Sequence, residues 1–97
     1  MTQEQAQELF INALEATPGV VKIMKVEENK PHRDVKFFCN KIDDGWHFIA
    51  TIQVLKSTNC RAIVRSIGEI LNFNLVKKNE KIGKLNIFIG GITNDQN

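Results

Sequence analysis

The stretch that decides the fold is VKFFCNKIDDGWHFIATIQVL, residues 35–55. Two apolar runs, 35–42 and 46–55, flank Asp43-Asp44-Gly45, and acidic residues followed by glycine are typical of a tight chain reversal. We therefore predict two antiparallel strands joined by a hairpin turn. Because side chains alternate across a strand, the second run has two different faces. One face carries Trp46, Phe48, Ala50, Ile52 and Val54, and the other carries His47, Ile49, Thr51, Gln53 and Leu55.

One amphipathic helix is predicted before this hairpin and another after it. Thr2 and Gln5 have the spacing of a capping box, and Thr17-Pro18-Gly19 ends the first helix. The segment 57–59 offers three N-cap residues for the second helix, whose apolar pattern fades at 72–74. The apolar positions are Ala6, Leu9, Phe10, Ala13 and Leu14 in the first helix and Ile63, Val64, Ile67, Ile70 and Leu71 in the second. Each helix thus has one apolar stripe to bury.

Two further strands complete the pattern. Residues 20–26 are short and β-branched, and in the segment 85–89 a leucine and two isoleucines occupy alternate positions. Leu75-Val76 is expected to start a short extended piece, and 27–34 to form a polar loop. The predicted order is α-β-β-β-α-β. An α+β two-layer sandwich, with both helices on one face of a mostly antiparallel sheet of three or four strands, would bury both stripes. The pattern does not determine the strand order.

The length and composition fit a single domain spanning residues 1–97. The chain is 42% hydrophobic and 25% charged, and it has no apolar run of the ~20 residues that a membrane span requires. Its first residues are acidic and polar, unlike a secretion signal. We expect a cytoplasmic protein with reduced cysteines, one that reaches a membrane surface only through a tethering partner.

The charged residues are unevenly distributed. The net charge is +2, yet residues 1–17 contain glutamates and no basic residue. Two basic clusters follow, and they form the candidate interaction surface: Lys56, Arg61 and Arg65, then Lys77, Lys78, Lys81 and Lys84. With the aromatic residues Phe37, Phe38, Trp46 and Phe48, they indicate an alternative function in which a small sheet binds RNA. The sequence has neither an RNP motif nor a G-x-x-G loop between helices.

The remaining motifs point away from catalysis and from cofactors. Gly90-Gly91 is followed by neither a lysine nor a helix, so it is not a phosphate loop. We expect these glycines to let the chain leave the sheet, or to let another backbone approach it. The spacings of His32, Cys39, His47 and Cys60 contain no close pair of the kind that marks a zinc site. Cys60, at a helix start beside a basic residue, is the single candidate for a reactive thiol.

Four segments together resemble a known family. They are ATPGV at 16–20, DDG at 43–45 before FIATIQV, NCRAIVRSIGEIL at 59–71 and LNIFIGGI at 85–92. This pattern, over about residues 6–92, is similar to the bacterial alkaline shock protein family, also called the Gls general-stress family. The resemblance implies a non-enzymatic cytosolic protein linked to cell-envelope homeostasis or stress. It further implies action through self-association or a membrane-associated partner, and no catalytic residues.

Overall fold

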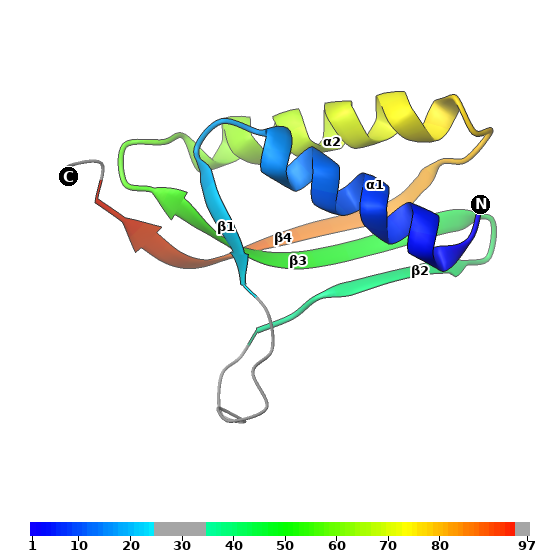
Figure 1. The fold of residues 1–97 in the computed structure, drawn as a ribbon, viewed down its shortest axis with the longest axis horizontal. Helices are drawn as coiled ribbons and strands as arrows, with labels where there is room; N and C mark the ends of the chain where they lie inside the picture. Colours follow the sequence, from blue (N-terminus) through cyan, green and yellow to red (C-terminus); the bar gives the residue numbers. More distant parts are fainter. Residues whose placement is uncertain (25–34, 95–97) are drawn as a thin grey trace.

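The computed structural model describes residues 1–24 and 35–94, which form two helices and four strands (Figure 1). The elements are α1 (Gln3–Ala16), β1 (Val20–Met24), β2 (Phe38–Ile42), β3 (Gly45–Leu55), α2 (Cys60–Val76) and β4 (Ile82–Thr93). The predicted order and the α+β class are confirmed.

The long strand β3 is the centre of the sheet. β1 and β2 both pair with it in antiparallel orientation, β1 along its C-terminal half and β2 along its N-terminal half, so they occupy the same edge of β3. β4 pairs along the other edge and runs parallel to β3. Two of the three pairings are therefore antiparallel, as predicted, while the longest is parallel.

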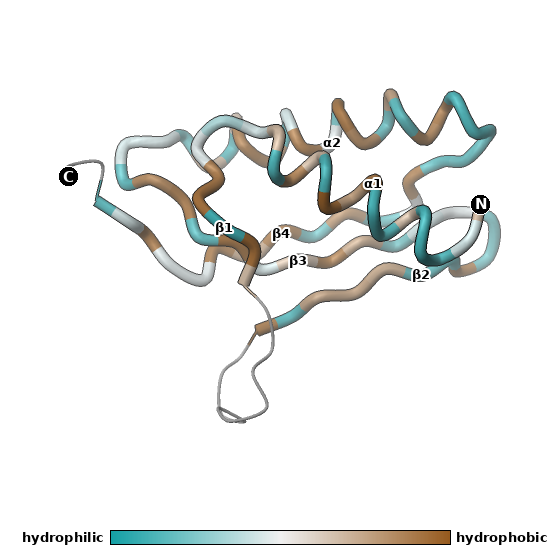
Figure 2. Tube along the Cα trace, in the orientation of Figure 1, coloured by the Kyte–Doolittle hydropathy of each residue, from teal (hydrophilic) through white to brown (hydrophobic). Residues whose placement is uncertain are grey.

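Both helices pack on one face of the sheet, and the apolar residues meet between the two layers (Figure 2). Phe10 of α1 contacts Phe48 of β3 with ring centroids 4.9 Å apart. The buried core consists of Ala6, Phe10, Ala13, Leu14, Cys39, Trp46, Phe48, Ala50, Ile52, Val54, Ile63, Ile67, Leu71 and Leu75. The face of 46–55 that carries Trp46, Phe48, Ala50, Ile52 and Val54 is thus the one packed against the helices, and each large buried side chain contributes about 1.5–3 kcal/mol.

The helix ends form as the local sequence indicates. The Thr2 side chain accepts a hydrogen bond from the Gln5 backbone, and the Gln5 side chain accepts one from the Thr2 backbone. Gly19, after α1, has φ of +97°, and a Cβ there would lie 2.6 Å from Thr58 Cγ2. A glycine is therefore required by both conformation and space at this turn. Asn59 caps α2 through the Ala62 backbone N–H.

Three predicted boundaries were wrong. β2 begins at Phe38 and not at residue 35, because the backbone N–H and C=O of Lys36 both bond to the side-chain hydroxyl of Thr51 and not to the backbone of β3. α2 does not fade at 72–74, and no extended piece starts at 75, because Leu75 is buried one turn after Leu71. The last strand continues to Thr93 and does not end at the glycines. The predicted end of the first strand and the polar loop 27–34 lie outside the described residues.

Candidate interaction surface

One face of the sheet carries no helix, and we call it the open face. Phe38 lies there opposite Ile49, and Phe88 lies there opposite Thr51. Phe38 and Phe88 are 39% and 42% exposed. The open face therefore presents two aromatic side chains, one on each side of β3.

The middle of the open face is covered by the chain itself. Thr51 is almost fully buried, and its hydroxyl donates to the Lys36 carbonyl and accepts from the Lys36 N–H, at 3.0 and 2.9 Å. The Lys36 ammonium also lies 5.4 Å from the centre of the Phe88 ring. Lys36 therefore lies on the open face, in contact with Thr51 and beside Phe88.

The two glycines of β4 have different surroundings. The pairing passes from Ile52↔Ile89 to Gln53↔Gly91, so Gly90 is the extra residue of a β-bulge. A Cβ at Gly90 would lie 2.5 Å from Met24 Sδ and 2.6 Å from Thr51 Cγ2. A Cβ at Gly91 would meet its nearest atom at 3.4 Å. The expectation that the glycines let the chain leave the sheet was wrong, because both stay within β4. The atoms that crowd Gly90 belong to the side chains of Met24 and Thr51, and not to another backbone as expected.

The outer edge of β4 has no neighbouring strand among the residues that the structure describes. No charged residue occurs between Leu85 and Thr93. Ile89 and Ile92 are 37% and 64% exposed, and Phe88 is also exposed. From Leu85 onward β4 is therefore an uncharged edge with apolar side chains in contact with water, while Lys84 lies near its start.

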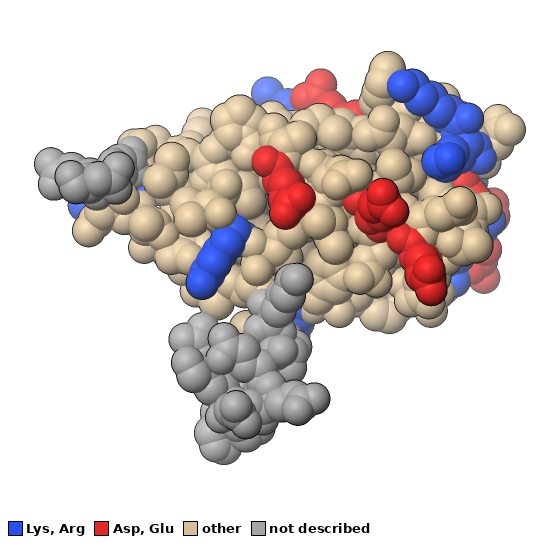
Figure 3. All heavy atoms as spheres, in the orientation of Figure 1, with Lys and Arg blue, Asp and Glu red and all other residues tan. Residues whose placement is uncertain are grey.

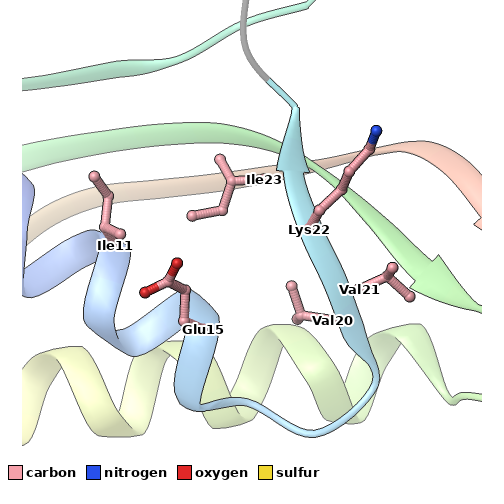
Figure 4. Close-up of a pocket in the computed structure, with 6 residues that line it drawn as sticks. All are labelled: Ile11, Glu15, Val20, Val21, Lys22 and Ile23. Atoms are coloured by element: carbon pink, nitrogen blue, oxygen red, sulfur yellow. The ribbon is translucent and has the colours of Figure 1, made fainter.

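The opposite edge of the sheet carries a small cavity between α1 and β1, about 460 Å³ in volume. Figure 4 shows its lining: Ile11, Glu15, Val20, Val21, Lys22 and Ile23. The Glu15 carboxylate and the Lys22 ammonium point in different directions, so the two charges do not close the cavity by pairing. Among the described residues that line it, one carboxylate and one ammonium that point apart do not form a set of catalytic groups.

The predicted basic surface is divided in space. Arg61 and Arg65 lie in the first turns of α2, while Lys77 and Lys78 follow its last residue. Arg65 and Lys77 are twelve positions apart, about 18 Å along a helix. Figure 3 shows basic side chains gathered where α2 leads into β4 and acidic ones over α1.

The other predicted basic residues have separate surroundings. Lys56 follows β3 and its N–H bonds to the Thr93 carbonyl. Lys81 forms an ion pair with Asp44 at 3.2 Å, and this hydrogen bond lowers the pKa of Asp44. Lys84 lies opposite His47 on the open face. Whether any of these lysines contacts a partner stays a prediction.

Sequence reasoning missed a cluster around Glu80. Its carboxylate accepts hydrogen bonds from Trp46 Nε1 at 3.0 Å and Lys41 Nζ at 3.2 Å, and it lies 3.5 Å from the Met1 amino group. The Trp46 hydrogen bond, followed by Lys41, lowers the pKa of Glu80. The cluster fixes the α2–β4 connection to the N-terminus and the hairpin. No local pattern marks Glu80, because its partners are distant in sequence.

The aromatic residues offer little to a stacked base. Trp46 and Phe48 are buried, and Phe37 packs against Phe10, so only Phe38 of the four is exposed. The RNA-binding alternative therefore rests on the divided basic clusters alone.

The two thiols differ in exposure. Cys39 is buried, which raises its pKa to about 11, and Cys60 is exposed. His32 lies outside the described residues. Within 1–24 and 35–94, no three or more His, Cys, Asp or Glu residues are placed to hold a metal ion. No helix in this part is long and apolar enough to cross a membrane.

No protein-family model and no curated protein matches this sequence. Solved structures do match its fold. MamM CTD D249H in its copper form superposes with a TM-score of 0.55 at 15% identity, covering 98% of this chain and 100% of that one. MamM V260R gives a TM-score of 0.57 at 16% identity, covering 94% and 98%. MamM-CTD 215-293 gives 0.55 at 16% identity, covering 91% and 96%. The chain therefore shares the α+β fold of the MamM CTD across nearly its whole length.

Proposed function

We propose that this domain is a non-enzymatic protein-interaction module that acts by associating with a second copy of itself. The observation that carries the proposal is the exposure of apolar side chains along β4. Phe88, Ile89 and Ile92 all contact water on one strand at the edge of the sheet. Exposed apolar groups gathered on one element are typical of surfaces that bind other proteins.

The likeness to the MamM CTD structures concerns the fold alone and is compatible with this role. One of them is a copper form, but metal binding is not part of our proposal. The described residues here do not assemble a metal-ligand cluster.

The finer proposal concerns the process that the module serves. On the resemblance to the alkaline shock protein family, we propose a role in cell-envelope homeostasis or stress, in the cytoplasm or at a membrane through a partner. The supporting residues are the four segments that carry the resemblance, which end at Ile92. Deleting the gene and measuring survival under envelope stress tests this link, and unchanged survival would argue against it.

Sedimentation velocity over a wide concentration range tests self-association directly. We expect a reversible shift from monomer to dimer as the concentration rises. In parallel, cross-linking in cells followed by affinity capture should recover the chain bound to itself. A strict monomer at the highest soluble concentration would contradict the proposal, whether or not another protein is captured.

A further inference from the structure

Among residues 1–24 and 35–94, no strand uses the row of backbone hydrogen-bonding groups along the outer edge of β4. β4 is 12 residues long and pairs with β3 on one side, whereas no described strand pairs with its other side. A strand edge of this kind is a template for another strand. We propose that the β4 edge of one copy pairs with the β4 edge of a second copy in antiparallel orientation, which joins the two sheets into one.

This proposal rests on the proposed self-association and names the surface that carries it. In a two-fold dimer, the same patch of both copies meets itself, so a charged patch would repel its own copy. Proteins commonly protect sheet edges with lysine or proline. The nine residues from Leu85 to Thr93 contain neither, nor any other charged residue. Over these nine residues the edge carries no charge that would repel its own copy, and the single charged residue of β4 is Lys84, near its start.

Both faces of β4 would gain contacts from a paired strand. Phe88 lies on the open face, because it is opposite Thr51. Ile89 lies on the helix face, because it is opposite the core residue Ile52, yet it remains 37% exposed. An incoming strand places a side chain beside each of them. A partner on the open face alone would cover Phe88 and leave Ile89 in water.

The opposite edge of the sheet is less suited to pairing. It consists of two separate five-residue strands, β1 and β2, and the pairing of β1 is irregular between Val20 and Lys22. Lys22 and Lys41, one on each strand, are exposed, as is Lys84 near the start of β4. The edge of β4 is continuous by comparison. Between the irregularities at Gly83 and Gly90 it is also regular, from Lys84 to Ile89.

The size of the edge sets the expected strength of the dimer. Nine residues of strand extend about 30 Å, and one paired edge covers less surface than the ~1,200–2,000 Å² of a standard stable interface. We therefore expect a reversible dimer that dissociates on dilution.

Four lysine substitutions in the 97-residue chain test the edge. Phe88→Lys and Ile89→Lys place a charge on the two faces of β4 and should each raise the dimer dissociation constant at least about tenfold, since each replaces an apolar contact with the partner strand by a charge that must lose water there. Phe38→Lys, on the open face at the other side of β3, and Phe73→Lys, on α2, replace phenylalanines that are 39% and 63% exposed. These two controls should change the constant less than about twofold, because they lie away from the edge. Urea unfolding confirms that each variant is folded.

The pattern of results separates the alternatives. Loss of association in Phe88→Lys and Phe38→Lys, but not in Ile89→Lys, would overturn edge pairing in favour of contact through the open face. A dimer unaffected by both β4 substitutions would also overturn it, while self-association would stand. If the unsubstituted chain is monomeric at every concentration, both proposals fail.

A cysteine scan provides a positional test. Directly opposed residues of paired strands share a face, so one residue of β4 must lie opposite its own copy at the two-fold axis. Opposed Cα atoms are about 4.5–5.5 Å apart, which permits a disulfide. Single cysteines from residue 84 to 89, in a chain carrying Cys60→Ser, should form a disulfide-linked dimer most readily at one position. Equal linking at all positions, or none in a sample that is dimeric, would overturn the pairing.

Discussion

Replacing Gly90 by alanine should destabilise the domain, while the same change at Gly91 should not. The new Cβ at position 90 would lie 2.5 Å from Met24 Sδ and 2.6 Å from Thr51 Cγ2. Carbon atoms in contact prefer about 3.5–4.0 Å, so a shift of about 1 Å is needed. Met24 can move its flexible side chain. Thr51 cannot rotate freely, because its hydroxyl is held by both backbone groups of Lys36.

The expected magnitude follows from two opposing effects. Gly90 is itself exposed, but forcing a side chain against packed neighbours costs about 1–3 kcal/mol, and exchanging glycine for alanine recovers about 0.4–1 kcal/mol by restricting the unfolded chain. Gly90→Ala should therefore lower the free energy of unfolding by about 1–2 kcal/mol, which is about 4–16 °C in Tm for a domain of this size. At Gly91, where the nearest contact is an ordinary 3.4 Å, we expect a change within about 0.5 kcal/mol.

Urea unfolding at a concentration where the chain is monomeric measures both variants. A double-mutant cycle then isolates the contact: Thr51→Ser keeps the hydroxyl and removes Cγ2, so it should relieve about 1 kcal/mol of the cost of Gly90→Ala. Equal effects of alanine at the two glycines, or no relief by Thr51→Ser, would refute the crowding argument.

Three further predictions concern the thiols, the Glu80 cluster and the first helix. Cys39 is buried and its pKa is raised to about 11, so at neutral pH one thiol of the native protein, Cys60, should react with a disulfide reagent. The second thiol should react only after unfolding, and fast reaction of both thiols would contradict this. The pKa of Glu80 is lowered in the folded state, so its contribution to stability is present above the unfolded glutamate pKa and is lost as the pH falls through the folded value. Glu80→Gln should therefore flatten the pH dependence of the urea midpoint over that acidic range. An unchanged slope would exclude the role of the Trp46 hydrogen bond. Thr2→Ala removes the capping side chain of α1 and should cost about 1 kcal/mol by urea unfolding, whereas Thr2→Ser should cost little.

The parts of the fold that could be predicted from sequence are those that neighbouring residues specify. The Thr2 cap, the reversal at Asp43-Asp44 and the alternation along 46–55 each depend on residues a few positions apart. The parts that were missed depend on distant partners. Lys36 ends the strand pairing because it meets Thr51, and Glu80 is held by Trp46. No spacing in the sequence brings such pairs together, so they become visible only in three dimensions.

The position of β4 is an intermediate case, and it determines the candidate site. A strand followed by a helix of 17 residues and another strand fits a parallel crossover, because about 26 Å of helix returns the chain along most of β3. That reasoning places β4 beside β3 and parallel to it, which hydrophobic alternation alone could not do. Once β3 has β1 and β2 on one side and β4 on the other, β4 must be an edge. The alternation from Leu85 to Ile89 predicted this last strand, and among the described residues the outer backbone edge of the strand is unpaired. Apolar side chains and free backbone groups therefore occur together on β4, and we expect a second copy to bind there.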